Sequence, residues 1–390
     1  MRWSSLILSS ICALGLFGSA HAQEVVPLPE QPVDLPWPDE SWPRGSLSET
    51  HSKAIADILD PVFATDVSEG LGETRALLII QEGRLVYDRY RPGITPETRH
   101  VSWSVAKSVT TTLVGRAVQT GLIASIDDPM PAAFEEGDPR REISWRHWVQ
   151  LLDGLDYGEY GVTELMENDA ALMMFGPGRF DQLAYARENF PLTHETGKRW
   201  NYSTATFHLV ARALQSLLPG TCVEEGADPA TCKADPRIMK DWVDEVLFDP
   251  LGIDGVIEFD PAGTFLGGSN IYMRAEDYAR FGLFLLRDGI WDGERLLPEG
   301  WADFNRTAPS SSDMNGYGGG FWLAPEQNDS PRIQYDPPYD AFHAGGREGQ
   351  LVWIIPSRNL VIARVGLMKD SPENWTALYK LAQEIGAALD

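Results

Sequence analysis

Residues 350–366, QLVWIIPSRNLVIARVG, contain two runs of apolar and β-branched residues on either side of Ser357-Arg358-Asn359. Two such runs separated by a short polar turn predict two strands joined as a hairpin. A second hairpin is predicted near the other end of the chain, where ALLIIQ (76–81) and RLVYDRY (84–90) flank Glu82-Gly83. The clearest strands therefore come from the two ends of the sequence.

The chain between these hairpins has mostly helical patterns. Helices are predicted near residues 104–120, 143–153, 180–190, 205–218, 237–248, 275–288 and 298–305, and also at 48–63 and 372–389. The simplest architecture is α+β, with one antiparallel sheet built from both chain ends and helices on its faces. The sheet lobe would comprise about 46–103 and 305–390, and the inserted helical lobe about 104–304.

The composition is that of an ordinary globular protein with ample material for a core. Of the 390 residues, 43% are hydrophobic and 23% are charged, and the formal net charge is −25. Such an acidic chain repels nucleic acid and anionic membrane surfaces, so we expect neither as a partner. After the first 22 residues no stretch approaches the ~18 apolar residues of a membrane span. The sequence gives no indication of oligomeric state.

The first 22 residues have the pattern of a secretory signal peptide. Arg2 precedes an apolar run that extends to Phe17, and Ala20-His21-Ala22 has the small-x-small form of a cleavage site. We therefore expect a periplasmic or secreted protein that is cleaved near Ala22. Residues 23–45 are rich in proline and lack periodic apolar positions, which predicts an extended leader over the surface.

Cys222 and Cys232 are the cysteines that remain after signal removal. An oxidising compartment would favour a disulfide between them. The surrounding segment is polar and contains glycine and proline, so the disulfide is expected to hold together a loop that connects two helices. The segment offers no further metal ligands, and the seven histidines of the chain are scattered without metal-binding spacing. No metal or other cofactor is expected.

Residues 101–115, VSWSVAKSVTTTLVG, carry the first candidate for chemistry. Ser104 lies three residues before Lys107 at the start of a predicted helix, so the hydroxyl and the amine would share one face. Desolvation disfavours an ammonium group, and a lysine in a water-poor pocket can therefore act as a base beside a serine nucleophile. The same spacing also occurs by chance on solvated helix faces, so the hypothesis depends on other segments.

Two other segments supply candidate groups. Tyr202 comes just before a predicted helix, in GKRWNYSTATFHLVARAL. Its phenol would either share a proton with Lys107 and Ser104 or pack as an ordinary aromatic ring. The sequence His343-Ala344-Gly345-Gly346 leads into a predicted strand. Glycines at a strand edge permit close approach by a ligand, although a simple turn would have the same composition.

Taken in order, these three segments resemble the serine β-lactamase and penicillin-recognising family, with its Ser-x-x-Lys, Tyr-x-Asn and Lys-Thr-Gly motifs. The likeness is greatest to the class C-like branch, and within it to the 6-aminohexanoate-dimer (nylon-oligomer) hydrolases and related esterases. It covers about residues 75–368 and includes SVAKSVTTTLVGRAVQTGLIASIDDPM, ISWRHWVQLLDGLDY, GGSNIYMRAEDYARFGLFLLRDGIWDGERLLPEGW and YGGGFWL. The resemblance implies a β-lactamase/transpeptidase-like fold.

The resemblance also implies roles for individual residues. Ser104 matches the family nucleophile, Lys107 the lysine that activates it, and Tyr202 the tyrosine that relays protons to and from the leaving group. The implied reaction is acylation of Ser104 followed by hydrolysis of the acyl-enzyme. The implied oxyanion hole uses the backbone N–H groups of Ser104 and Gly346. Whether Lys107 or Tyr202 is the general base stays open, because both groups titrate near ~10 when free.

The sequence departs from the family pattern at two positions that would face substrate. Thr204 replaces the asparagine that commonly follows the tyrosine by two residues, and His343 replaces the lysine of the third motif. We nevertheless expect Thr204, His343, Gly345 and Gly346 to contribute to substrate binding. A neutral histidine does not supply the fixed charge that a penicillin carboxylate would need, although Arg347 could replace it. These departures argue against efficient β-lactam hydrolysis.

The sequence analysis therefore favours an exported serine hydrolase that cleaves a small amide or ester. The alternatives are a DD-peptidase or β-lactamase that acts on cell-wall-like substrates, and a binding protein of the same fold without catalysis. The chain has no Gly-x-Ser-x-Gly motif, which excludes the nucleophile elbow of α/β-hydrolases. Aromatic and methionine-containing segments such as DYGEYG, MMFGPGRF and QYDPPYDAF favour a partly apolar, linear substrate.

Overall fold

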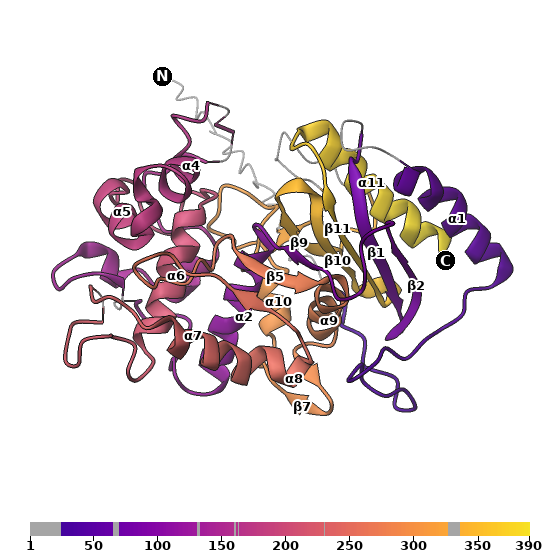
Figure 1. The fold of residues 1–390 in the computed structure, drawn as a ribbon, viewed down its shortest axis with the longest axis horizontal. Coiled ribbons are helices and arrows are strands. Elements are labelled where there is room, and N and C mark those ends of the chain that lie inside the picture. The colour runs from indigo at the N-terminus through magenta and orange to yellow at the C-terminus, as the bar shows by residue number, and fades with distance from the viewer. Residues whose placement is uncertain are drawn as a thin grey trace, which may run out of the picture.

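The computed structural model describes residues 25–64, 70–130, 133–159, 161–162, 164–229, 231–326 and 336–390. Its main sheet has six antiparallel strands in the order β2-β1-β11-β10-β9-β8 (Figure 1). These strands are β1 (Glu73–Gln81), β2 (Arg84–Tyr90), β8 (Trp322–Leu323), β9 (Phe342–Gly346), β10 (Gln350–Ile355) and β11 (Leu360–Leu367). The prediction of an antiparallel sheet built from both chain ends is therefore confirmed.

The helices lie on both faces of the main sheet and in a group at one side of it (Figure 1). They are α1 (Glu49–Ala64), α2 (Val105–Gln119), α3 (Trp145–Val149), α4 (Asp169–Met174), α5 (Gln182–Asn189), α6 (Thr204–Ser216), α7 (Pro236–Val243), α8 (Asp249–Leu251), α9 (Ala275–Leu286), α10 (Trp301–Asn305) and α11 (Pro372–Ala388). The predicted helix at 143–153 is shorter than expected, and the one at 237–248 continues from α7 into a π-helical turn, Asp244–Phe248.

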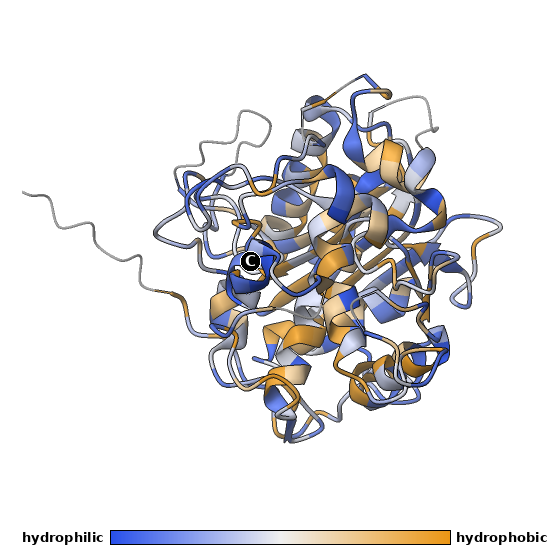
Figure 2. Ribbon diagram, turned by 90° about the vertical axis from the view of Figure 1, so that its left-hand side faces the viewer, coloured by the Kyte–Doolittle hydropathy of each residue, from blue (hydrophilic) through white to orange (hydrophobic). Residues whose placement is uncertain are grey.

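Side chains of the main sheet alternate between two separate hydrophobic cores, as the period of a strand requires. Leu77 and Ile79 of β1 pack with α1 and α11 on one face. Leu78 and Ile80 face the larger core, which includes α2 and α9. Figure 2 shows apolar residues concentrated in the central strands, with hydrophilic stretches around the outside. The position of a residue in a strand therefore decides which core it enters.

The helical middle of the chain also contains strands that the sequence analysis missed. β3 (Arg99–Val101), β5 (Ile271–Arg274) and β4 (Val256–Ile257) form a three-stranded sheet in that order. A further hairpin joins β6 (Ile290–Trp291) to β7 (Glu294–Arg295). These strands have two to four residues, which is too short for an alternating pattern to stand out from neighbouring helices. The small sheet matters because β3 leads directly to Ser104.

The proline-rich segment before α1 lies along the body of the protein and is bound by Arg287, a buried residue directly after α9. Arg287 donates to the carbonyl of Pro29 and to the side chain of Gln31, at 3.0 and 2.9 Å. Leu35 and Trp42 are buried. The predicted signal peptide, residues 1–22, lies outside the described residues. Within the described part of the chain, no helix is long and apolar enough to cross a membrane.

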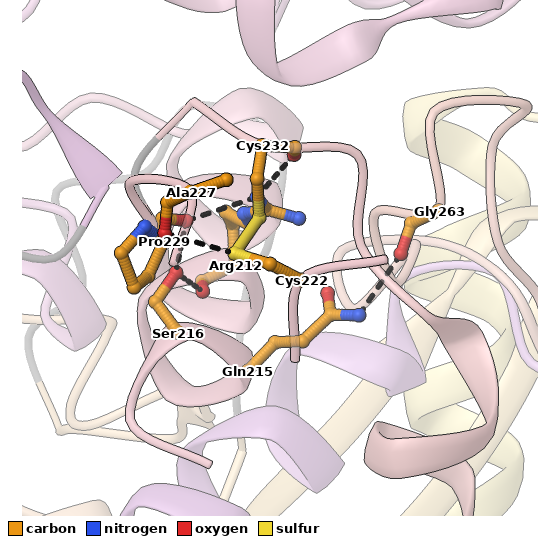
Figure 3. The surroundings of a disulfide bond; sticks show 8 residues. All are labelled: Arg212, Gln215, Ser216, Cys222, Ala227, Pro229, Cys232 and Gly263. Carbon is orange, nitrogen blue, oxygen red and sulfur yellow. Dashed lines mark hydrogen bonds between the residues drawn. A yellow bond between two sulfur atoms is a disulfide. The ribbon is translucent and has the colours of Figure 1, made fainter. Parts of the chain in front are cut away.

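The predicted disulfide between Cys222 and Cys232 is present, and it closes a loop between α6 and α7 (Figure 3). Arg212 of α6 is fully buried and donates to the carbonyls of Pro229 and Cys232, at 2.9 and 2.7 Å. Ser216, one turn further along α6, donates to the same Pro229 carbonyl at 2.9 Å. The disulfide loop is therefore attached to the helix whose first turn reaches the candidate active site.

Candidate active site

Ser104 immediately precedes α2, and its approach to that helix is fixed by the small sheet. The Ser102 backbone N–H donates to the Ile271 carbonyl at 2.7 Å, and the Ser102 hydroxyl accepts from the Ile271 N–H at 3.0 Å. α2 is buried along most of its length, so it is a core helix rather than a solvated one. The helix N-terminus favours negative charge, and Ser104 lies at this position.

The residue before Ser104 has an unusual backbone conformation. Trp103 has φ +44°, in the left-handed region that a bulky side chain rarely adopts. Its indole N–H donates to the Glu348 carboxylate at 2.9 Å, and Glu348 itself has φ +63°. Two strained residues on distant segments are thus joined by one hydrogen bond. Strain of this kind, about 1–3 kcal/mol per residue, persists where the surroundings impose it and is frequent at active sites.

Lys107 lies within hydrogen-bond reach of Ser104. Its Nζ is 3.0 Å from the Ser104 Oγ, 2.9 Å from the Thr204 Oγ1 and 2.8 Å from the Gly268 carbonyl oxygen. The side chain is only 1% exposed. Burial lowers the Lys107 pKa to about 8, and the charge of Glu159 opposes this shift. A substantial fraction of the amine is therefore neutral near physiological pH, as a base requires.

Tyr202 lies beside the same amine, where α6 begins. The Lys107 Nζ is 4.8 Å from the centre of the Tyr202 ring, and Tyr202 is 8% exposed. The ring stacks on Trp322 of β8 at 5.4 Å and packs against Trp200 and Tyr317. Ser203 caps α6 by accepting from the Thr206 N–H at 2.9 Å. The structure therefore brings Ser104, Lys107 and Tyr202 together and adds an aromatic wall.

Thr204 and Glu159 extend the hydrogen-bond network away from Lys107. The Thr204 hydroxyl donates to the Glu159 carboxylate at 2.9 Å, and the Thr204 backbone N–H donates to its second oxygen at 2.7 Å. The Tyr157 hydroxyl also donates to that second oxygen, at 3.0 Å. Glu159 thus accepts three hydrogen bonds beside the predicted catalytic pair.

Sequence reasoning missed two of these groups, Glu159 and the Gly268 carbonyl. Glu159 lies in DYGEYG, a segment whose aromatic content bears only on the shape of the pocket, and its loop has no periodic pattern. Gly268 lies in a Gly-Gly-Ser sequence, where a Cβ would lie 2.6 Å from the Thr204 carbonyl oxygen. The paired glycines were therefore the available signal, because such a close approach of two backbones requires glycine.

Gly346, at the end of β9, lies against the backbone that carries Ser104. A Cβ at this position would be 2.2 Å from the Ser102 carbonyl oxygen and 3.2 Å from the Ser104 backbone nitrogen. Among the described residues, β8 pairs with β9 only at Phe342 and His343. The Gly346 end of β9 therefore has a strand partner only on the β10 side. The Gly346 backbone thus lies beside the Ser104 N–H, as the predicted oxyanion hole requires.

The expected role of the His343 side chain in substrate binding needs correction. His343 is 0% exposed and stacks on Trp353 of β10, with ring centres 4.9 Å apart. Its Nε2 is 3.1 Å from the hydroxyl of Tyr379 on α11. Trp353 and Tyr379 both belong to the core opposite α2. Strand alternation thus turns the His343 ring away from the face of the sheet that packs on α2, and burial lowers its pKa to about 3.

Gly345 and Arg347 occupy the two positions beside Gly346. A Cβ at Gly345 would lie 3.5 Å from Trp322, which is an ordinary van der Waals contact. Arg347 is exposed, so a cation is available next to the predicted oxyanion hole. The substrate-binding roles of Thr204, Gly345 and Gly346 stay predictions.

Comparison with known proteins decides the family. Residues 63–225 and 218–384 match the family model described as Beta-lactamase. The chain belongs to the Beta-lactamase family. A curated relative of this β-lactamase-family protein is the 6-aminohexanoate-dimer hydrolase of Paenarthrobacter ureafaciens. It is 22% identical over an alignment of 346 positions that covers 83% of this chain and 81% of the relative. The resemblance expected from the three motifs is therefore confirmed.

Solved structures confirm the fold of this β-lactamase-family protein. A candidate 6-aminohexanoate-dimer hydrolase from Bacillus anthracis aligns with a TM-score of 0.65 and 16% identity, covering 94% of this chain and 92% of that one. A penicillin-binding protein homologue from Caulobacter crescentus aligns with a TM-score of 0.60 and 18% identity, covering 88% and 99%. The β-lactamase/transpeptidase-like fold is thus shared with a candidate dimer hydrolase and with a penicillin-binding protein homologue.

Proposed function

We propose that this protein is an exported serine hydrolase that cleaves amide or ester bonds through an acyl-enzyme on Ser104. The observation that carries the proposal is the 3.0 Å contact between the Lys107 Nζ and the Ser104 Oγ, within a buried network. A serine beside a desolvated amine is an activated nucleophile. The family membership supports hydrolase chemistry.

In the proposed first step, neutral Lys107 takes the hydroxyl proton of Ser104 while the serine oxygen bonds to the substrate carbonyl carbon. The carbonyl oxygen becomes negative and accepts hydrogen bonds from the backbone N–H groups of Ser104 and Gly346. The proton then passes by way of Tyr202 to the departing amine or alcohol as the carbonyl–leaving group bond breaks. The lowered pKa of Lys107 favours the lysine as the base.

In the second step, water attacks the acyl group on Ser104. Lys107, with Tyr202 as the relay, removes a proton from that water, and the Ser104 oxygen recovers its proton when the acid product leaves. The Lys107 Nζ lies 4.8 Å from the centre of the Tyr202 ring, so the two residues are neighbours, and the relay role of the phenol rests on the family resemblance.

We infer a small, partly apolar and linear substrate. The aromatic rings of Trp200, Tyr317 and Trp322 around Tyr202 would favour an apolar group on the leaving side. A β-lactam is less well suited, because the His343 side chain supplies no charge at the site. The name of the curated relative, 6-aminohexanoate-dimer hydrolase, supports a linear amide as one candidate class.

Export is part of the proposal. The disulfide between Cys222 and Cys232 is typical of a periplasmic or secreted protein, and it agrees with the signal-like pattern of residues 1–22.

The test compares wild type with Ser104→Ala on p-nitrophenyl esters of short acids, linear amide dimers and nitrocefin. We expect ester or amide turnover and fluorophosphonate labelling by wild type, and neither by Ser104→Ala. Retained turnover by Ser104→Ala would overturn the proposal. Preferential turnover of nitrocefin would assign the protein to the β-lactamases instead. Stoichiometric binding of every substrate without turnover would indicate a non-catalytic relative.

A further inference from the structure

The hydrogen bonds around Lys107 have a definite direction. The Gly268 carbonyl can only accept a hydrogen bond. The Thr204 hydroxyl has one proton, and that proton is donated to the Glu159 carboxylate at 2.9 Å. Toward Lys107, 2.9 Å away, the Thr204 oxygen can therefore only accept. Two of the three groups that contact the Lys107 amine can therefore only accept hydrogen bonds from it.

This restriction decides where the lone pair of the neutral amine lies. A neutral amine has two N–H groups and one lone pair. The two N–H groups are required by the Gly268 carbonyl and the Thr204 oxygen, which are 2.8 and 2.9 Å from the Nζ. The third direction is that of the Ser104 Oγ, 3.0 Å away. The lone pair therefore points at the one hydroxyl whose proton must be removed.

We propose that Glu159 is a positioning residue for catalysis, which acts through the Thr204 hydroxyl to direct the Lys107 lone pair at Ser104. The inference rests on the proposed function, because it assumes that Lys107 is the base. Glu159 does not touch Ser104. Without the carboxylate, the threonine hydroxyl could either donate a hydrogen bond to the amine or accept one from it. Because the hydroxyl donates to Glu159, it can only accept from the amine.

An amide at position 159 would reverse the direction of the network. The Glu159 oxygen that accepts from the Thr204 N–H and from Tyr157 must stay an acceptor, so the amide oxygen of a glutamine would take that place. The amide NH₂ would then face the Thr204 oxygen and donate to it. The Thr204 proton would turn toward Lys107 and compete with Ser104 for the lone pair. Glu159→Gln is therefore a nearly isosteric test.

The charge of Glu159 alone predicts the opposite result. Glu159 raises the Lys107 pKa, so removing the charge lowers that pKa and increases the neutral amine at pH 7. The other titratable groups facing Lys107 are Tyr202 and His208 of α6. His208 is buried with a pKa lowered to about 3, so it is neutral throughout the assay range. A charge effect would thus raise the kcat of Glu159→Gln at pH 7, whereas a Lys107 lone pair turned away from Ser104 would lower it.

The experiment is a double-mutant cycle on the full-length protein, with p-nitrophenyl butyrate as substrate and kcat measured between pH 6 and 9. The variants are Glu159→Gln, Thr204→Val and the double variant, with Ser104→Ala in parallel. We expect Glu159→Gln to lower the plateau kcat about 10- to 100-fold, the loss typical of a misaligned catalytic group. The Thr204→Val background has no hydroxyl that could turn toward Lys107. There, Glu159→Gln should lower kcat by less than about threefold.

Matched controls separate this role from general damage to the loop. Tyr157→Phe removes one hydrogen bond to Glu159 and leaves the Thr204 contact, so it should keep most of the wild-type kcat. Thr204→Ser keeps the hydroxyl and should stay sensitive to Glu159→Gln. Circular dichroism and thermal melting check that every variant folds.

Additive losses in the cycle, or a faster Glu159→Gln at pH 7, would overturn the inference while leaving the proposed function intact. Activity in Ser104→Ala would overturn the proposed function itself, and the inference with it. A large Glu159→Gln loss that disappears in the Thr204→Val background supports both.

Discussion

The two sides of Ser104 are built differently. On the proposed oxyanion side the groups are backbone N–H groups, next to the Trp103–Glu348 hydrogen bond and the close approach of Gly346 to the Ser102 carbonyl. On the proposed base side the groups are side chains, which can gain and lose protons. The backbone N–H groups do not titrate, whereas the proposed role of Lys107 depends on the loss and gain of a proton.

Two buried cations illustrate the difference. Arg364 of β11 is 1% exposed and donates to the carbonyls of Gly349 and Leu71, both at 2.7 Å. Burial lowers its pKa only to about 10, so the guanidinium stays charged and holds the turn after Gly346. Lys107 is equally buried, but its pKa is lowered to about 8. The arginine thus keeps its charge when buried, whereas the lysine can lose it, as the proposed role of Lys107 as base requires.

The largest expected effect is on the base side. Lys107→Met keeps the length and packing of the side chain but removes the base, so kcat should fall about 10³- to 10⁴-fold. Ester turnover and the rate of fluorophosphonate labelling measure the loss. Lys53→Met, at an exposed lysine paired with Asp57 on α1, is the control and should behave as wild type. Comparable activity in both variants would show that Lys107 is not the base.

Gly346→Ala tests the oxyanion side. The new Cβ would lie 2.2 Å from the Ser102 carbonyl oxygen, so either backbone must move. Loss of one oxyanion donor costs about 10²- to 10³-fold in kcat, and we expect a loss of that size with little change in KM. Gly345→Ala is the matched comparison, since its Cβ meets ordinary contacts at 3.4 Å or more. Equal losses at both positions would contradict the steric argument.

The pH dependence of wild type tests the base side without a mutation. Lys107 is active when neutral, so protonation below a pKa of about 8 should remove activity. We expect kcat/KM to rise about tenfold per pH unit from pH 6 to nearly pH 8 and then to level off. A profile that is flat across this range would indicate that Lys107 does not titrate in the free enzyme.

Substitution of Glu348 tests whether its strained backbone conformation is linked to the alignment of the backbone around Ser104. Glu348→Gly relieves a residue with φ +63° but removes the hydrogen bond to the Trp103 indole. The free energy of unfolding should therefore rise or hold constant to within about 1 kcal/mol, while kcat falls about tenfold. Glu348→Gln keeps an acceptor and should recover most of the kcat. Denaturant unfolding and ester kinetics give the two values, and a parallel fall in both would count against the link.

The smallest effect on activity is expected at His343. His343→Phe removes the contact with Tyr379 on the far face of the sheet, so kcat should stay within about threefold of wild type. Stability should fall by about 1 kcal/mol, the usual value of a hydrogen bond. Because burial lowers the His343 pKa to about 3, wild-type stability should also decline as the pH falls below 6.5. A selective loss of activity would restore His343 to the substrate site.

The sequence was most informative where a pattern is local. The two apolar and β-branched runs in 350–366 predicted β10 and β11, and the spacing of Ser104 and Lys107 predicted a shared helix face. The hydrogen bond between those side chains agrees with that prediction. Such patterns depend only on the geometry of one element.

The sequence was least informative where a side chain depends on contacts made far along the chain. The direction of the His343 ring follows from which core lies on each face of β9, and the spacing of the motif does not contain this information. Glu159 reaches Thr204 from a loop with no period. The bond between Trp103 and Glu348 joins residues 245 positions apart. Each of these contacts is a product of the completed fold.

The pairing of β1 with β11 has a consequence for the order of events during synthesis. β1 pairs with β2 in an early hairpin, but its other partner is β11, in which Leu367 pairs with Glu73, so this second neighbour is made only near the end of the chain. Gly346 of the proposed oxyanion hole is likewise synthesised long after Ser104. The proposed nucleophile and base are therefore made well before the proposed active site can be complete. Contacts of such long sequence separation form slowly. The nascent chain must therefore avoid aggregation until β9, β10 and β11 have been synthesised.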